Sequence, residues 1–380
     1  MDFKLTQEQH MLQDTAARLV RDTYSFEQRE EHRQSPRGFS YAFWQQLGEL
    51  GLTSVPFDPA YGGFGGNGVD VMLVAQELGR GLCLEPFLHS VIFAGGLIEQ
   101  LGSQEQKSEL LPQVVGATLQ LAVALQEPQS HYQLHDVQTR AEAVQGGWRL
   151  SGRKSVVVAG HCADVLLVSA RNSGDSRDQA GISLFLVDPK SPGVSLRAYP
   201  SLDGRMACDV LLDQVSVSAG AMLGAPGAAL PALRYQQGRA IAAQCAEAVG
   251  SMTATCELTL DYLKTRKQFG QPIGKFQVLQ HRMVDMHIEL DQATSMAMLA
   301  ACVADQPDSD ERTRTLCAAK FIVCRAARYI ADQGIQLHGG IGLTWEYVLS
   351  HHAKHLLMVA RQLGDDDYHL QVYSELMAVV

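Results

Sequence analysis

The apolar positions of this chain follow a helical period at both ends and a strand period in the middle. Near the start, TQEQHMLQDTAARLVRD has a capping Thr6 and then places Leu12, Ala16 and Leu19 on one face, as an amphipathic helix requires. The segments SYAFWQQLGELG, GVDVMLVAQELGRG and SQEQKSELLPQVV predict further helices. We therefore predict an N-terminal α-helical domain over residues 1–118.

The segments between residues 119 and 225 are short, rich in β-branched residues and bounded by Gly, Pro, Asn or Asp. They include LQLAVAL, ADVLLVSAR, GISLFLVD and VSLRAYP. The segment VQGGWRLSG predicts a hairpin that turns at Gly146-Gly147. This pattern predicts a middle antiparallel β domain, a small barrel or sandwich, over residues 119–225.

The helical period returns at about residue 226 and continues to the end of the chain. The segments RAIAAQCAEAVGSMTATCELTLDYLK and VLQHRMVDMHIELDQATSMAMLAACVA predict long helices, and QPDSDERT (306–313) is a polar break between later ones. We predict a C-terminal four-helix bundle over residues 226–380. The predicted fold class is α+β.

Composition and charge narrow the classes of function. The 380 residues carry a formal net charge of −10 with no basic block, which argues against a nucleic-acid partner. The eight cysteines lack C-x-x-C or zinc spacing. Five of them lie in apolar helical segments, and we interpret these as reduced, buried thiols of a cytoplasmic protein: Cys245, Cys256, Cys302, Cys317 and Cys324. No apolar run approaches membrane-spanning length, so we expect no membrane partner. His351 and His355 have i, i+4 spacing but no matching third ligand, and we predict no metal site.

The segment TRKQFGQPIGKFQ, residues 265–277, lies between the two long helices. A connection between helices needs only a short polar turn. Here Arg266 offers a planar fork that suits phosphate, Phe269 offers a flat apolar face, and Gly270 permits close backbone approach. These residues are compatible with a site for a phosphorylated ligand and equally with a capped turn that carries a surface cation.

The order of the three blocks and three motifs together resemble the acyl-CoA dehydrogenase family, over essentially the whole chain. The motifs are AYGGFGG…AQELGR, YLKTRKQFGQPIGKFQVLQHRMVDM and QLHGGIGLTWEY. Within that family, LDYLKTRKQFG, LHGGIG and the Gly-Asp near the C-terminus resemble the small subunit of pimeloyl-CoA dehydrogenase.

The resemblance implies FAD as the cofactor and an acyl-CoA as the substrate. Arg266 would pair with the FAD pyrophosphate, because a guanidinium binds phosphate in a forked geometry. Gln268 and Phe269 would line the dinucleotide, and Gln277 would hydrogen-bond to it.

A second motif would complete this contact. Gln336, Gly339 and Gly340 would approach the adenine end of FAD, where glycine lets the backbone come close. In the family these contacts reach across a subunit interface, into flavin held mainly by the neighbouring subunit. The resemblance therefore implies an oligomer.

The resemblance also implies the reaction, the α,β-desaturation of an acyl-CoA thioester in fatty-acid β-oxidation and lipid metabolism. A carboxylate removes the α-proton, and the β-hydrogen leaves as hydride to flavin N5, which gives a trans-2-enoyl-CoA. The base needs a dry pocket that raises its pKa toward the working pH. An electron-transfer flavoprotein is the implied acceptor. Fatty, dicarboxylic, aromatic-derived and steroid side-chain thioesters all remain open as substrates.

Several positions depart from the family pattern. Many members carry Trp-x-Thr on a strand against the flavin ring, but SGRKSVVVAG has Val156 and Val158 at these points. The segment LQEPQSHYQ (125–133) keeps only the Glu-Pro of the usual Thr-Glu-Pro-Gly-x-Gly-Ser. The catalytic Glu near the C-terminus corresponds to Leu363, and its alternative position on the helix before TRKQFG corresponds to Ala240.

Glu247 is the candidate base that remains. It follows Ala240 by seven residues, about two helical turns, and so returns to roughly the same helix face. A lone Glu among small and apolar neighbours is either a functional acid or a structural one, here paired with Arg239 or Arg266. Asp365 is a second candidate, although three consecutive aspartates are typical of a solvated turn.

Three functions stay open at this point. The chain is a subunit of a heteromeric dehydrogenase whose helical bundle completes a partner's flavin site, a self-sufficient homo-oligomeric dehydrogenase that uses Glu247, or a non-catalytic acyl-CoA-binding or structural homologue. Flavin stoichiometry separates them. One FAD per chain indicates the second function, flavin bound only with a partner indicates the first, and none under any condition indicates the third.

Overall fold

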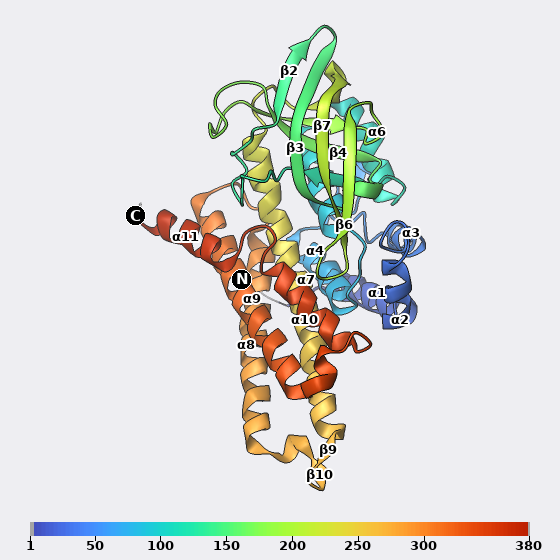
Figure 1. Cartoon of the computed structure of the whole chain (residues 1–380), viewed down its shortest axis with the longest axis vertical. Coiled ribbons are helices and arrows are strands. Elements are labelled where there is room, and N and C mark those ends of the chain that lie inside the picture. The colour runs from blue at the N-terminus through green and yellow to red at the C-terminus, as the bar shows by residue number, and fades with distance from the viewer. Residues whose placement is uncertain (1–3, 379–380) are drawn as a thin grey trace. The chain divides into compact units, whose positions relative to one another are not determined.

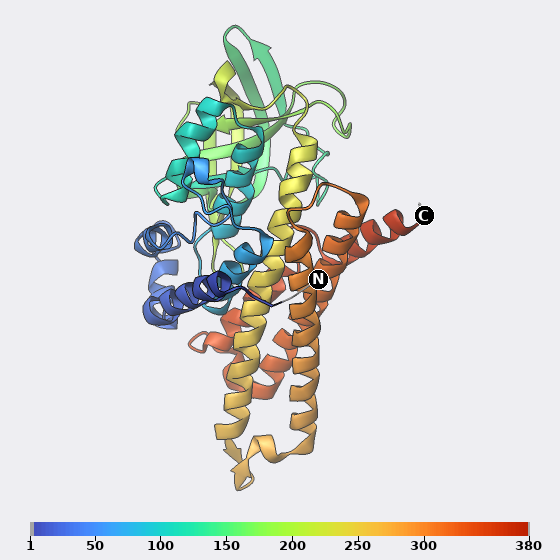
Figure 2. The same cartoon turned by 180° about the vertical axis from the view of Figure 1, so that it is seen from behind.

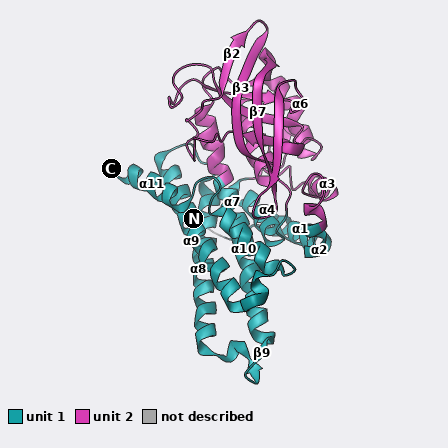
Figure 3. Cartoon of the chain, in the orientation of Figure 1, with its two compact units in different colours: residues 1–30, 67–83, 241–380 teal, residues 31–66, 84–240 magenta. Residues whose placement is uncertain are grey.

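The computed structural model describes residues 4–378, which form two compact units. Unit 1 contains residues 1–30, 67–83 and 241–380, and unit 2 contains residues 31–66 and 84–240 (Figure 3). Each unit thus combines segments that are distant in the sequence. The predicted α+β class is confirmed, whereas the three-domain division at residues 118 and 225 stays a prediction.

Unit 1 is almost entirely helical. Its α-helices are α1 (Gln7–Thr23), the start of α2 (Phe26–Arg33), α4 (Gly68–Arg80), most of α7 (Leu230–Thr265), α8 (Gln277–Val303), α9 (Asp310–His338), α10 (Val348–Val359) and α11 (Asp366–Met377). Its short elements are β9 (Lys267–Gln268), β10 (Gln271–Pro272), and the 3-10 turns η5 (Ile273–Lys275) and η6 (Gly339–Leu343). Figures 1 and 2 both show α7 and α8 side by side, joined at one end by the β9–β10 hairpin.

Local signals begin several of these helices. Thr6 caps α1, as predicted, and forms a capping box with Gln9, and Asn67 and Asp70 form the same arrangement at α4. Ser309 caps α9, which therefore begins inside the predicted polar break (306–313). The core of the unit lies where α7, α8, α9 and α10 bury their apolar faces against one another.

Two glycines bring α4 against α7. A Cβ added to Gly79 would lie 1.9 Å from the carbonyl oxygen of Glu247, and a Cβ added to Gly250 would lie 1.8 Å from that of Gln76. Residues without a side chain are therefore required at both points. This contact fixes the stretch of α7 that carries Glu247.

Unit 2 contains short helices and the sheet. Its helical elements are α3 (Tyr41–Glu49), η1 (Pro59–Tyr61), the π-helical η2 (Phe87–Gly95), α5 (Gly96–Leu101), α6 (Gln104–Val115), η3 (Gly160–Cys162), η4 (Ala219–Ala221) and the start of α7. Its strands are β1 (Leu121–Ala124), β2 (Arg140–Val144), β3 (Gly147–Val158), β4 (Val165–Arg171), β5 (Ile182–Val187), β6 (Val194–Pro200), β7 (Met206–Ser218) and β8 (Met222–Leu223).

The sheet of unit 2 has the strand order β6-β7-β3-β2-β4-β5-β8, with β1 added beside β4. Most neighbours are antiparallel, as predicted, but the β1–β4 and β2–β4 pairs are parallel. The predicted hairpin joins β2 to β3 and pairs Val144 with Gly147, so its turn consists of Gln145 and Gly146. One face of the sheet packs around Leu150, Phe185 and other apolar side chains to form the core of this unit.

Candidate functional site

The TRKQFG segment folds as a tight β-hairpin rather than a plain helix–helix turn. Lys267 pairs with Pro272 and Gln268 pairs with Gln271, which leaves Phe269 and Gly270 as the two turn residues. Their φ angles are +54° and +79°, as a type I′ turn requires. The hairpin therefore holds an aromatic residue in a left-handed conformation at its tip.

The side chains of this hairpin are directed toward solvent. Phe269 is 90% exposed, although its ring edge meets Phe276 at a centroid distance of 6.0 Å. Arg266, Gln268 and Gln277, the first residue of α8, are also exposed. A large aromatic residue beside an arginine and two amides, all accessible, is typical of a surface that another molecule covers.

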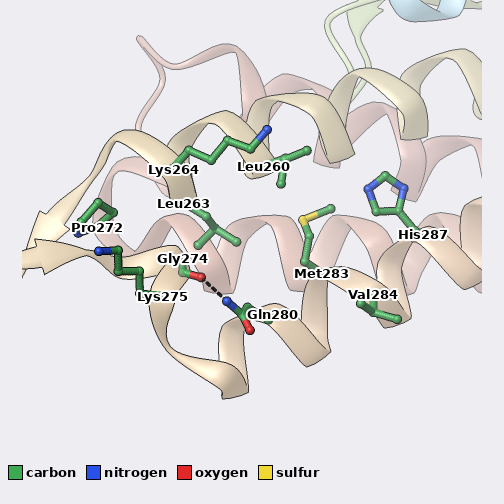
Figure 4. A pocket seen from close by; sticks show the side chains of 10 residues that line it. All are labelled: Leu260, Leu263, Lys264, Pro272, Gly274, Lys275, Gln280, Met283, Val284 and His287. Atoms are coloured by element: carbon green, nitrogen blue, oxygen red, sulfur yellow. Dashed lines mark hydrogen bonds between the residues drawn. The ribbon is translucent and has the colours of Figure 1, made fainter.

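A pocket lies between the end of α7 and the start of α8, next to the hairpin (Figure 4). Its volume is about 540 Å³, within the range of small-molecule sites. Leu260, Leu263 and Met283 form much of its apolar lining, and Lys264 and Lys275 also contribute to its wall. The hairpin thus adjoins a concave, partly basic surface.

The second motif follows α9. Gln336 is exposed on the last turn of α9, and Gly339 and Gly340 begin η6. No atom lies within 4 Å of a Cβ built on either glycine, and Gly339 has a φ of +64°. The backbone of this turn is therefore open to close approach by a ligand.

Two aromatic residues connect the motifs. The ring of Tyr262, on α7, stacks on His338 at a centroid distance of 4.4 Å, and its carbonyl accepts a hydrogen bond from the backbone N–H of Arg266 at 2.8 Å. His338 directly precedes Gly339. Tyr262 and His338 were not among the residues predicted from the sequence, although each lies within a quoted motif. The contact between them could only be found in three dimensions.

The two valines on β3 do not form a flavin platform. β3 is bulged between Lys154 and Val157, and Val156 in that bulge has a φ of +55°, which is rare for a β-branched residue. Its side chain is 43% exposed, and its N–H lies 3.2 Å from the Tyr199 hydroxyl oxygen. Val158 pairs with Ala207 of β7. Neither valine can stack on a ring or donate a side-chain hydrogen bond.

The 125–133 segment is held by a buried ion pair. Glu127 accepts from the Lys154 ammonium at 2.6 Å, and its two oxygens also accept from the backbone N–H groups of Gln138 and Thr139. Burial favours the neutral acid, but Lys154 and these donors outweigh it and lower the pKa of Glu127 to about 2. Both side chains are at most 2% exposed. The residue that survives from the family pattern therefore serves the fold of this loop.

Leu363, which corresponds in the sequence to the family's catalytic Glu, is partly buried. Leu363 packs against the core of unit 1 with a φ of +56°, and its carbonyl lies 3.0 Å from Nε2 of His369. Asp365 caps α11 by accepting from the Tyr368 N–H at 2.9 Å, and it lies 3.6 Å from Arg361. Asp365 thus has a structural contact of its own.

Glu247 lies inside unit 1 and is 6% exposed. One of its oxygens is 3.8 Å from Nε2 of His355 on α10. The sequence suggested Arg239 or Arg266 as its structural partner, and this stays a prediction, while the structure shows an ion-pair distance to a histidine. His355 on α10 thus lies beside a carboxylate of α7, a contact that the i, i+4 spacing of His351 and His355 did not reveal. In residues 4–378, no group of three or more His, Cys, Asp or Glu side chains could hold a metal ion.

All eight cysteines lie in the described part of the chain and are free thiols. Of the five cysteines predicted to be buried, four are buried and Cys302 is partly exposed. Among the described residues, no helix is long and apolar enough to cross a bilayer.

The residues present fit FAD in one region and not in another. The two turns of unit 1 offer a guanidinium, amides and open glycine backbone, which are the donors and the space that a dinucleotide requires. β3 offers only Val156 and Val158 where the isoalloxazine ring would need an aromatic platform and a hydrogen-bond donor. The donors that suit a dinucleotide therefore lie in unit 1, and β3 offers no platform for the ring.

Three family models match successive parts of the chain. Residues 6–118 match the N-terminal domain of acyl-CoA dehydrogenase, residues 122–215 the middle domain and residues 234–377 the C-terminal domain.

Individual proteins show the same relationship. Acyl-CoA dehydrogenase FadE12 of Mycobacterium tuberculosis is 30% identical over 310 residues, which cover 80% of this chain and 79% of that protein. A structure of a variant of the Tcur3481-Tcur3483 steroid ACAD has a TM-score of 0.88 at 29% identity and covers 98% of both chains. The ChsE4-ChsE5 complex from Mycobacterium tuberculosis has a TM-score of 0.89 at 24% identity over 100% of both chains, a likeness that shows the fold. The chain therefore belongs to the acyl-CoA dehydrogenase family of FAD-binding oxidoreductases.

Proposed function

We propose that this chain is one subunit of a heteromeric acyl-CoA dehydrogenase and that its two exposed turns complete a flavin site whose ring-binding half lies on a different chain. The observation that carries the proposal is the contrast between the exposed residues of the hairpin and the valines of β3. The side chains of Arg266, Gln268, Phe269 and Gln277 are presented to solvent. In contrast, Val156 lies in a bulge of the sheet.

The chain's own residues would bind and orient the cofactor. Arg266 would neutralise the pyrophosphate, Phe269 would cover an apolar face of the dinucleotide, and Gln268 and Gln277 would donate to its polar edges. Bound FAD supplies the hydride acceptor for desaturation of the acyl-CoA. The α-proton base would come from the partner, because Leu363 carries no group that accepts a proton.

Two structural neighbours are consistent with an assembly of unlike chains. The ChsE4-ChsE5 structure is described as a complex, and the steroid ACAD carries the paired name Tcur3481-Tcur3483. The resemblance to the small subunit of pimeloyl-CoA dehydrogenase supports the same arrangement. We extend the proposal to the cytoplasm as location and to an electron-transfer flavoprotein as acceptor.

The test is flavin stoichiometry with and without a partner. The chain is expressed alone and together with the product of an adjacent dehydrogenase reading frame, and FAD is released from the purified protein and quantified. We expect no bound flavin in the chain alone and, in an assembly of two such chains with two partners, about half as much FAD as there are chains. A homo-oligomer with FAD in every subunit and acyl-CoA turnover would contradict the proposal.

A self-sufficient enzyme that uses Glu247 is the second candidate. The observation in its favour is a carboxylate that is only 6% exposed and lies 3.8 Å from the His355 ring. Burial is what a catalytic acid needs to work near neutral pH. Glu247→Gln keeps the shape and removes the basicity, so it should abolish turnover while FAD content stays constant. Near-normal turnover in this variant would exclude the assignment.

A further inference from the structure

The turn that follows α9 is exposed at most of its positions and anchored at both ends. Within residues 339–347, the side chains of Leu343 and Trp345 are 71% and 46% exposed. Two buried histidines flank the turn, His338 at the end of α9 and His351 near the start of α10. The anchors are therefore buried imidazoles, whereas the turn between them is accessible.

His351 joins the far end of the turn to helix α2. Its Nε2 lies 2.8 Å from the carbonyl oxygen of Trp345, and its Nδ1 lies 3.3 Å from the guanidinium of Arg29. A carbonyl only accepts and a guanidinium only donates, so the ring is neutral and carries its proton on Nε2. Glu30, also on α2, accepts from the indole Nε1 of Trp345 at 3.0 Å and from Arg29 at 2.9 Å. An N-terminal helix thus holds a C-terminal turn within unit 1.

His338 anchors the other end in a different way. Its Nδ1 lies 2.8 Å from the carbonyl oxygen of Gly334, and its Nε2 lies 3.2 Å from the hydroxyl of Tyr347. A hydroxyl both donates and accepts, so Tyr347 can adapt if His338 gains a proton. A guanidinium cannot adapt in this way. Protonation of His351 therefore breaks its contact with Arg29, whereas protonation of His338 leaves its contact with Tyr347 intact.

We propose that Arg29, Glu30 and His351 are positioning residues that hold the turn 339–347 in the shape that presents its two glycines, and that acidification releases it. We call these three residues the latch. The proposal rests on the proposed function, because the shape of the turn affects the enzyme only if the turn contacts flavin.

The charges around His351 determine the direction of the pH effect. The charged or titratable neighbours are Arg29 and Glu30 from α2 and His352, Lys354 and His355 from α10. Burial is the largest influence and lowers the pKa of His351 below its usual 6.5, with Arg29 and Lys354 acting in the same direction, while the Trp345 carbonyl and Glu30 oppose them. The ring stays neutral at neutral pH. When it is protonated in acid, an N–H at Nδ1 points at the guanidinium and the contact with Arg29 breaks.

The first test compares the variant Glu30→Ala with its matched control Glu30→Gln. The Gln side chain keeps an oxygen that accepts from the indole, and Ala does not. Amide hydrogen exchange is measured over residues 339–347 at neutral pH, in the full chain in whichever assembly it purifies. Loss of the hydrogen bond to Trp345 and of the contact with Arg29 should make exchange about fivefold faster or more in Glu30→Ala. Exchange in Glu30→Gln and the unfolding midpoint should stay close to the wild type. Equal exchange in Glu30→Ala and the wild type would overturn the latch.

The second test uses His351→Gln, whose amide nitrogen can donate to the Trp345 carbonyl but does not titrate. In the wild type, protection of the turn should fall as the pH drops below 6.5, after correction for the intrinsic rate of exchange. In His351→Gln this fall should be absent. If that variant does not fold, the emission of Trp345, taken as the difference from Trp345→Phe, follows the same transition in the wild type. A turn that stays protected until the whole protein unfolds would contradict the proposal.

FAD affinity in the complex distinguishes failure of the latch from failure of the proposed function. Glu30→Ala should weaken FAD binding by about the same fivefold factor that exchange reports. If the turn loosens and FAD affinity does not change, the turn has no role at the flavin and the positioning proposal falls. If FAD binding depends on Arg266 while Glu30→Ala leaves the turn unchanged, the proposed function stands and the latch is wrong.

Discussion

The region around the β3 bulge and the exposed turns of unit 1 differ in how far their side chains are satisfied within the chain. Around β3, Glu127 and Lys154 neutralise one another, and the Val156 N–H is bonded to Tyr199. At the turns, Phe269 is 90% exposed and nothing lies over Gly340. One region satisfies its polar groups within the chain, and the other leaves its side chains and glycine backbone exposed.

This difference explains how a chain with two valines at these points of β3 keeps its fold. A strand that gives up ring-stacking and hydrogen-bonding side chains must still satisfy its backbone and buried charges. Here the chain does so with its own residues. The exposed turns, in contrast, gain little for folding from the side chains of Phe269 and Arg266, which are explained best by binding. The predictions below test the two regions separately, from the largest expected effect to the smallest.

Removing one member of the buried pair should have the largest effect. Lys154→Ala leaves the Glu127 carboxylate buried without its cation, and the free energy of unfolding should fall by about 3–5 kcal/mol. Arg153→Ala is the matched control one residue earlier on β3. Arg153 is half exposed in its pair with Asp209, so its loss should change stability by less than about 1 kcal/mol. Urea unfolding of both variants measures this, and similar losses would show that the buried pair is not special.

Acid should destabilise helix α11 of unit 1 and the β3 region at different pH. Burial lowers the pKa of His369 from 6.5 to about 4, so its contribution is complete above pH 6.5 and is lost as the pH falls toward 4. Burial opposes ionisation of Glu127, but Lys154 outweighs it and lowers that pKa from 4.5 to about 2, so this contribution is lost only between pH 4.5 and 2. Each difference corresponds to about 3 kcal/mol.

The measurement is hydrogen exchange followed by mass spectrometry across this pH range. Amides of α11 around His369 should lose protection before those of the 125–139 segment around Glu127. If protection in the 125–139 segment is lost first, the assignment of these pKa directions to the two regions is wrong.

Arg266→Ala should leave folding intact and weaken FAD binding. Arg266 is exposed, so the unfolding free energy should change by less than about 0.5 kcal/mol. Loss of one charge-assisted contact to phosphate should raise the FAD dissociation constant of the complex by about tenfold or more. Lys267→Ala on the same hairpin is the control, because it removes a cation that the proposal does not use. Unchanged FAD content after gel filtration of Arg266→Ala would contradict the assignment.

Val156→Gly should have the smallest effect, and a favourable one. A β-branched residue with a φ of +55° is strained by about 1–2 kcal/mol, and glycine removes that strain while it loses more entropy on folding. We expect a net gain in stability of up to about 1 kcal/mol, measured by urea unfolding. Val158→Gly, in the regular part of β3, should instead destabilise the protein. A destabilising Val156→Gly would show that the valine side chain makes a contact that matters at the bulge.

The amino-acid sequence by itself determined the order of helical and β segments, the cap at Thr6, the β2–β3 hairpin and the family. These features depend on periodicity and turn chemistry, which are local, and on motifs that are contiguous in the sequence. The tertiary structure alone decided that Phe269 is bare, that Val156 lies in a bulge, that Glu127 faces Lys154 and that Glu247 faces His355. Each of these depends on which distant segment packs against the residue, and no local pattern in one sequence records that choice.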